Sequence, residues 1–163
     1  MAIIKNGILV KVYKKDIING HYTVQDGVTI IDYSAFPEAA LESVTLPEGL
    51  IEIRSLAFVF NRLKEIIIPD SVIKIGSSAF MGDNLEKVVL PQGLEIIEFS
   101  TFFGNNLKKL TIPRGVQRIE FGAFDINPLK EVIIEGEPRI EENAFPKTTK
   151  LIYRAPKVKT LVK

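Results

Sequence analysis

Few residues in this 163-residue chain could do chemistry, because it has no cysteine, no tryptophan and a single histidine, His21. The lack of cysteine excludes a disulfide, a thiolate zinc site, an iron–sulfur cluster and a cysteine nucleophile. One histidine also excludes a metal site built from several histidines of the same chain. As a general base, His21 needs an orienting carboxylate and a nucleophile, and the sequence identifies neither. We expect His21 to lie in a surface turn next to Asn19-Gly20.

Acidic and amide side chains are the remaining candidates for chemistry. Glu141 and Glu142 are adjacent, and adjacent residues of an extended chain point to opposite faces, so these carboxylates do not converge. A phosphate-binding glycine loop, a Gly-x-Ser-x-Gly turn and a His-x-x-x-His spacing are all missing from the sequence. We therefore predict that the chain is not an enzyme and needs no cofactor or metal.

The overall composition is that of a soluble domain with a hydrophobic core. Hydrophobic residues make up 46% and charged residues 25% of the chain, and 163 residues fit one domain over 1–163. The formal net charge of +1 gives no reason to expect nucleic acid as a partner. No stretch approaches the roughly 18 apolar residues of a membrane-spanning helix. The first residues do not form a signal peptide, so the chain as it stands is expected to be cytoplasmic.

A repeat of 22 residues runs through most of the sequence. Prolines recur at this spacing, each after Leu or Ile, at positions 47, 69, 91 and 113. Phenylalanines follow the same period at 36, 58, 80, 102 and 124, with Phe145 one residue early, and each follows Ala or Thr. A leucine series occupies 41, 63, 85, 107, 129 and 151, and an isoleucine series occupies 31, 53, 75, 97, 119 and, one residue early, 140. This regularity predicts a solenoid.

Each repeat unit contains one clear short strand. In the segment 63–69, Ile66 and Ile68 should point inward and Ile67 outward, by the alternation of side chains along a strand. Pro69 marks the end of the strand because proline has no amide proton to donate to a sheet. The phenylalanines should fill the interior and stack as an aromatic spine. Asn or Asp recurs three residues after the phenylalanine, at Asn61, Asp83, Asn105 and Asn127.

These four corner residues have two interpretations. A column of metal ligands needs converging carboxylates, and only Asp83 is acidic. We favour the other interpretation, in which the side chains form hydrogen bonds with backbone groups that the tight turn would leave unpaired.

The unit L-x-x-V-x-L-P-x-G-L-x-x-I-x-x-x-A-F resembles the BspA-like class of leucine-rich repeat. Residues 41–50, followed by Ile53, Ala57 and Phe58, match it almost position by position. The resemblance implies a right-handed, mostly β solenoid with a parallel sheet, which binds a protein or host-surface partner and has no enzymatic activity. It also implies a bacterial protein that is secreted or on the cell surface. The family usually has cysteine at the four corner positions, where this chain has Asn or Asp.

We expect three parts within the domain. Residues 1–21 should form a capping hairpin around Asn6-Gly7, residues 22–145 about six repeats, and residues 146–163 a basic C-terminal cap. The cap carries six basic residues and no acidic one: Lys147, Lys150, Arg154, Lys157, Lys159 and Lys163. These could bind phosphate or anionic lipid. We favour the alternative that lysines on an edge strand prevent end-to-end association.

The outward-facing positions of the strands form the candidate binding surface. One predicted column consists of Thr23, Thr45, Ile67, Val89, Thr111 and Ile133, and the column beside it of Ser43, Glu65, Lys87, Lys109 and Glu131. Glu65 should pair with Lys87, and Lys109 with Glu131, since neighbouring strands lie ~4.8 Å apart. The β-branched column could reflect strand propensity alone. It could equally be an apolar strip rimmed by charges, which is typical of a protein-binding surface.

We predict a non-catalytic protein-binding module, which as a monomer or weak oligomer uses this surface. The alternative is a structural segment of a homo-oligomer or of a larger surface protein.

A further column combines Tyr33, Ser55, Ser77, Phe99 and Phe121. The two phenylalanines either fill a widened interior or stack outside as an anchor for a partner. We favour interior filling.

Overall fold

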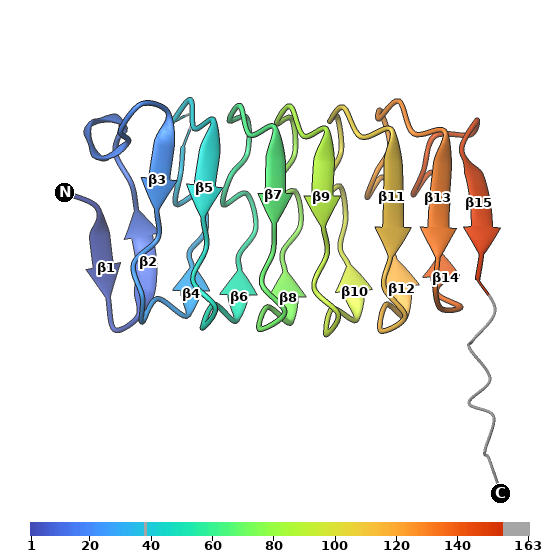
Figure 1. Ribbon diagram of the computed structural model, residues 1–163, viewed down its shortest axis with the longest axis horizontal. Coiled ribbons are helices and arrows are strands. Elements are labelled where there is room, and N and C mark those ends of the chain that lie inside the picture. Colours follow the sequence, from blue (N-terminus) through green and yellow to red (C-terminus); the bar gives the residue numbers. More distant parts are fainter. Residues whose placement is uncertain (38, 155–163) are drawn as a thin grey trace, which may run out of the picture.

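The computed structural model describes residues 1–37 and 39–154, and shows a β-solenoid whose coils are stacked along one axis (Figure 1). Each coil contributes one strand to each of two faces, which are named here for the length of their strands. The long-strand face consists of β3 (His21–Thr23), β5 (Ser43–Thr45), β7 (Glu65–Ile67), β9 (Lys87–Val89), β11 (Lys109–Ile112), β13 (Glu131–Ile134) and β15 (Lys150–Tyr153). The short-strand face consists of β4 (Ile30–Ile31), β6 (Glu52–Ile53), β8 (Lys74–Ile75), β10 (Ile96–Ile97), β12 (Arg118–Ile119) and β14 (Arg139–Ile140). The paired strands within both faces are parallel, so the predicted mostly β solenoid is confirmed.

The alternation predicted for each strand is confirmed in β7. Ile66 and Ile68 are buried, whereas Ile67 faces solvent. The strand ends just before Ile68 and Pro69, where the missing amide proton of proline stops sheet pairing. Val88 of β9 and Leu110 of β11, which occupy the position of Ile66 in their own strands, also point inward.

The core is a single hydrophobic cluster, and it contains the predicted aromatic spine. The six phenylalanine rings stack in order from Phe36 to Phe145, with centroids 4.6–5.3 Å apart. Tyr22 closes one end of the spine by packing its edge against Phe36 at 5.4 Å. Stacked and edge-on aromatic pairs contribute stability beyond that of the surface area that they bury. The spine therefore helps to hold each coil against the next.

The corners contain a backbone feature that the sequence did not indicate. A residue with positive φ recurs in every coil immediately before the Ala-Phe pair, at Ser34, Leu56, Ser78, Ser100, Gly122 and Asn143. A second such column comprises Phe60, Gly82, Gly104 and Ile126. Most of these positions carry no glycine, although the left-handed region is costly for other residues. The stacked packing on both sides therefore holds these turns in place.

The N-terminal hairpin forms as predicted. The strands β1 (Ile3–Lys5) and β2 (Ile8–Lys11) are antiparallel, and both Asn6 and Gly7 have positive φ. β2 then pairs in parallel with β4, so the hairpin covers the open edge of the short-strand face. A short 3₁₀ turn, η1 (Lys14–Asp16), leads toward β3.

At the other end, the last unit is shorter than the sequence suggested. Leu151 lies opposite Val132, 19 residues earlier, and not in the leucine column of Leu129. The 22-residue spacing from Leu129 to Leu151 was therefore misleading, because three residues are lost between β13 and β15.

The basic end of the chain lies partly within the described residues. Lys150 begins the edge strand β15, and Arg154 lies 3.9 Å from Glu135. The predicted cap residues Lys157, Lys159 and Lys163 lie outside the described residues. No helix within 1–37 and 39–154 is long and apolar enough to cross a membrane.

Candidate binding surface

The β-branched column lies on the outside of the long-strand face, as the alternation predicted. Its members are in register where their strands pair: Thr23 with Thr45, Ile67 with Val89, and Thr111 with Ile133. Ile67 is 62% and Val89 42% exposed, while Ile133 is partly buried. The register adds Ile152 of β15, opposite Ile133, which the sequence reasoning missed because the last unit is short.

The charged column lies beside it, with weaker ion pairs than the sequence suggested. Lys87 Nζ is 4.0 Å from Glu65 Oε2, and both side chains are about two-thirds exposed, so solvent screening leaves this pair a small contribution. Lys109 and Glu131 are opposite each other in the register, yet their charged atoms are more than 4.0 Å apart. The second predicted pair therefore does not form a salt bridge.

The long-strand face is interrupted at two places. The hydrogen-bonded groups are β3–β5, β7–β9 and β11–β13–β15, and within the described residues no backbone hydrogen bond joins β9 to β11. Figure 1 shows the wider spacing of these two strands. The backbone amides and carbonyls on the facing edges of β9 and β11 thus have no partner in the neighbouring strand.

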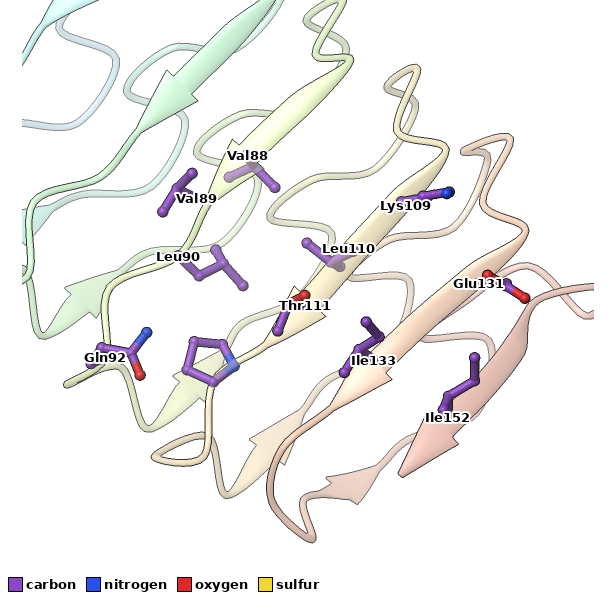
Figure 2. Close-up of a pocket in the computed structure, with 11 residues that line it drawn as sticks. Val88, Val89, Leu90, Gln92, Lys109, Leu110, Thr111, Glu131, Ile133 and Ile152 are labelled. Carbon is purple, nitrogen blue, oxygen red and sulfur yellow. The ribbon is translucent and has the colours of Figure 1, made fainter. Parts of the chain in front are cut away.

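A hollow of about 430 Å³ lies at the opening between β9 and β11 and continues toward β15. Figure 2 shows Val89, Thr111, Ile133 and Ile152 in a row across four strands, with Lys109 and Glu131 to one side of the row. Five of the residues predicted for binding therefore line one depression: Val89, Lys109, Thr111, Glu131 and Ile133. The other predicted residues, Thr45, Glu65, Ile67 and Lys87, lie on β5, β7 and β9 beyond its rim. The inward-facing residues Val88, Leu90 and Leu110 form part of its lining, because the opened sheet leaves their edges accessible.

His21 lies in strand β3 and not in the turn where we expected it. The turn ends at Gly20, and His21 is already paired with Ser43 in the register of β3 and β5. Its Nδ1 is 2.8 Å from Ser43 Oγ, and its Nε2 is 3.1 Å from Thr23 Oγ1. The ring therefore contacts hydroxyl groups at both nitrogens, and no carboxylate among the described residues hydrogen-bonds to it as in a catalytic triad.

A second, smaller hollow of about 300 Å³ lies on the short-strand face. Its lining comes mainly from β6, β8 and the residues that follow them, and Tyr33, Lys74 and Glu98 are among its lining residues. Most of its charges are already paired with neighbouring charges. Arg54 is 2.8 Å from Asp32 and 3.7 Å from Glu52, and Glu52 is 3.1 Å from Lys74.

Phe99 and Phe121 point outward, so the favoured interpretation of these residues as interior fillers is wrong. Both are about half exposed, and their rings stack with centroids 6.1 Å apart. Their backbone amides donate to the carboxylates of Glu120 and Glu141 in the following coils, at 2.9 and 3.1 Å. This arrangement fixes the rings as a stacked pair on the surface.

The corner column behaves as the structural interpretation predicted. Asn61, Asn105 and Asn127 are buried and bonded to backbone groups of their own and adjacent coils. Across the described ranges, no three His, Asp or Glu side chains converge in a way that could hold a metal ion.

The repeat and its coils agree with one known family of proteins. A family model described as the BspA type leucine-rich repeat region matches residues 29–152 in six copies. The chain belongs to the BspA-type leucine-rich repeat family. The resemblance indicated by residues 41–58 is therefore confirmed. No curated protein matches the chain.

Two solved structures have a similar fold. A leucine-rich repeat protein from Bacteroides ovatus is 21% identical, with a TM-score of 0.52 over 83% of this chain. The pneumococcal vaccine antigen PcpA is 16% identical, with a TM-score of 0.51 over 93% of this chain. A leucine-rich cell surface protein from Faecalibacterium prausnitzii is 18% identical over 84% of this chain, with a TM-score of 0.41. The chain spans 55%, 45% and 60% of their respective lengths.

Proposed function

We propose that the chain is a protein-binding module that contacts its partner through the long-strand face, centred on the hollow between β9 and β13. The observation that carries this proposal is the position of the hollow. It lies where the sheet opens, and its lining combines an apolar strip with one basic and one acidic side chain, Lys109 and Glu131. Interfaces commonly have such an apolar centre with a polar rim.

The partner that fits this surface is a protein that presents an apolar side chain flanked by charges of both signs. The hollow is large enough for a side chain or a short segment of a partner, and it faces solvent. The unpaired backbone edges of β9 and β11 offer hydrogen bonds that an approaching polypeptide can use. A secreted or cell-surface location stays a prediction from the family resemblance.

The proposed surface is tested by comparing the proteins that the wild type and two variants capture. The wild type and the double variant Ile67→Lys/Val89→Lys are used as bait for the same host extract and the same target-cell extract. A matched control, Ile51→Lys/Ile73→Lys, places two lysines at exposed isoleucines outside the long-strand face. We expect a partner that the wild type and the control retain and the Ile67/Val89 variant loses.

Retention of the same partner by all three baits would contradict the proposed surface. Light scattering of the wild type at micromolar concentration tests the alternative, a homo-oligomer. A dimer that dissociates only in the Ile67/Val89 variant would assign the face to self-association instead.

A further inference from the structure

The corner column contains one residue that does not fit the hydrogen-bonding pattern of the others. In Asn61, the side-chain Oδ1 accepts from Leu41 N at 3.1 Å, and Nδ2 donates to the carbonyls of Phe36 at 2.9 Å and Phe58 at 2.8 Å. Asn105 makes the same three bonds to Leu85, Phe80 and Phe102, and Asn127 to Leu107, Phe102 and Phe124, all between 2.8 and 3.0 Å. Each of these corners therefore contains one backbone amide that needs an acceptor and two backbone carbonyls that take hydrogen bonds from a donor.

Asp83 occupies the equivalent corner between Asn61 and Asn105, and has the acceptor without an obvious donor. Its Oδ1 accepts from Leu63 N at 3.4 Å, as the repeat requires. Its Oδ2 is fully buried and has no hydrogen-bond partner among the described residues. Asn61 Nδ2 faces the carbonyls of Phe36 and Phe58. The 22-residue repeat therefore places the carbonyls of Phe58 and Phe80 opposite Oδ2 of Asp83. Both are acceptors, so an ionised carboxylate would place negative oxygen against negative oxygen.

The surroundings of Asp83 offer no compensating charge. Asp83 is 2% exposed and forms no salt bridge within residues 1–37 and 39–154. The side chains above and below it in the column are the neutral amides of Asn61 and Asn105, and the backbone groups that act on its carboxyl belong to Leu63 and Asn61. Burial raises the pKa of the Asp83 carboxyl to about 8, although the backbone of Leu63 and Asn61 acts in the opposite direction. A buried charge without a counter-ion is costly, and the protonated acid avoids that cost.

We propose that Asp83 is a neutral carboxylic acid at pH 7, whose O–H donates a hydrogen bond to the carbonyl of Phe58 or Phe80, and that its ionisation destabilises this corner. The other three corners carry amides, which do not titrate. Asp83 is thus a single pH-sensitive point in a column that is otherwise independent of pH. It lies between β7 and β9, the strands that carry Ile67 and Val89. The inference does not depend on the proposed function.

The direction of the pH effect follows from linkage between protonation and folding. The folded protein holds the Asp83 proton to about pH 8, whereas the unfolded chain releases it near the ordinary value of 3.8. Stability is therefore fully present below pH 3.8 and is lost as the pH rises toward 8, after which the loss stops. Within this window the ratio of folded to unfolded molecules should fall up to tenfold per pH unit, relative to a chain with an amide at this corner.

Three variants isolate the effect. Asp83→Asn restores the amide that the other corners have, and Asn105→Asp installs an acid at a corner that lacks one. Asp26→Asn removes the same charge from an exposed position and serves as the control. Urea unfolding of each is compared with the wild type at unit pH steps from 4 to 9. We expect Asp83→Asn to gain stability over the wild type as pH rises, Asn105→Asp to lose it, and Asp26→Asn to show neither trend.

A direct measurement on the wild type supports or overturns the proposal even if a variant fails to fold. The ¹³C chemical shift of the Asp83 carboxyl, followed by NMR from pH 3 to 9, reports its protonation. Titration above pH 7 is the expected result. A carboxyl that titrates near 4, or a stability gain of Asp83→Asn that is constant across the pH range, would overturn the proposal.

Discussion

The ring of Phe80 lies parallel to the ring of Phe102 in the next coil, with the centroids 5.3 Å apart and the planes inclined by 2°. Phe58 packs on the opposite side of Phe80 at 5.1 Å. Phe80 is thus fully enclosed between two coils, and its 22-residue spacing places each ring over the one before. The 22-residue period of the phenylalanines thus produces ring contacts between successive coils.

Replacement of Phe80 by alanine should lower the free energy of unfolding by about 3–5 kcal/mol, because it removes a fully buried ring and leaves a cavity between two coils. Urea unfolding monitored by circular dichroism measures the change. A loss below about 1 kcal/mol would show that the ring is not enclosed.

Phe145→Ala is the comparison within the spine, since Phe145 is 8% exposed and stacks on Phe124 at the end of the series. It should cost less than Phe80→Ala. Phe36 lies at the other end of the spine, near the N-terminal hairpin. The structure encloses Phe36 between Tyr22 and Phe58, so we expect a loss as large as that of Phe80.

Phe99→Ser should change the free energy of unfolding by no more than about 1 kcal/mol, because the ring is half exposed. Ser55 and Ser77 occupy the same column in two other coils, so serine is compatible with this backbone. Phe121→Ser is the matched second case. Thermal unfolding of both variants against Phe80→Ala tests the outward position, and a loss close to that of Phe80→Ala would place these rings in the core.

Ile126→Gly should raise the free energy of unfolding by about 1 kcal/mol, because a β-branched residue at positive φ is strained. Ile126 has φ of 54° and a largely exposed side chain, so few contacts are lost. Gly104 occupies the same column at φ of 68°, with open space where the methyl group of an alanine would lie, and Gly104→Ala should cost a similar amount. Urea midpoints of the two variants should move in opposite directions, and a shared direction would argue against strain at this corner.

Arg54→Met should lower the melting temperature by a degree or two at pH 7, and by less at an acid pH at which Asp32 begins to be protonated. The Arg54 guanidinium hydrogen-bonds to Asp32 and holds the pKa of that carboxyl below its usual value. An acid with a lowered pKa stabilises the fold above its unfolded pKa, and this contribution is lost as the pH falls through its folded pKa. Calorimetry at both pH values measures the difference.

Arg114→Met is the control for this pair, since Arg114 is exposed and forms no ion pair with the described residues. An effect of Arg54→Met that is as large at acid pH as at pH 7 would assign the contribution of Arg54 to packing instead of charge.

Several features of the candidate surface could be predicted from the repeat, whereas others could not. The outward position of Ile67 and the registers of Ile67 with Val89 and of Thr111 with Ile133 result from alternation and from a constant spacing of 22 residues. Ile152 was missed because the spacing to Ile133 is 19 residues, which no repeated residue type marks. The contact of His21 with Ser43 depends on the first strand pair beginning at His21, which the turn signal at Asn19-Gly20 obscured.

The sequence by itself determined the solenoid, the aromatic spine and the corner amides of this protein. These features depend only on which residues recur at a fixed period, and stacking brings such residues into contact. The tertiary structure alone decided where the sheets open and that Phe99 and Phe121 turn outward. Those outcomes accompany left-handed backbone conformations at residues such as Ser100 and breaks in strand pairing between coils. Both features depend on packing across several coils, and no single repeat encodes them.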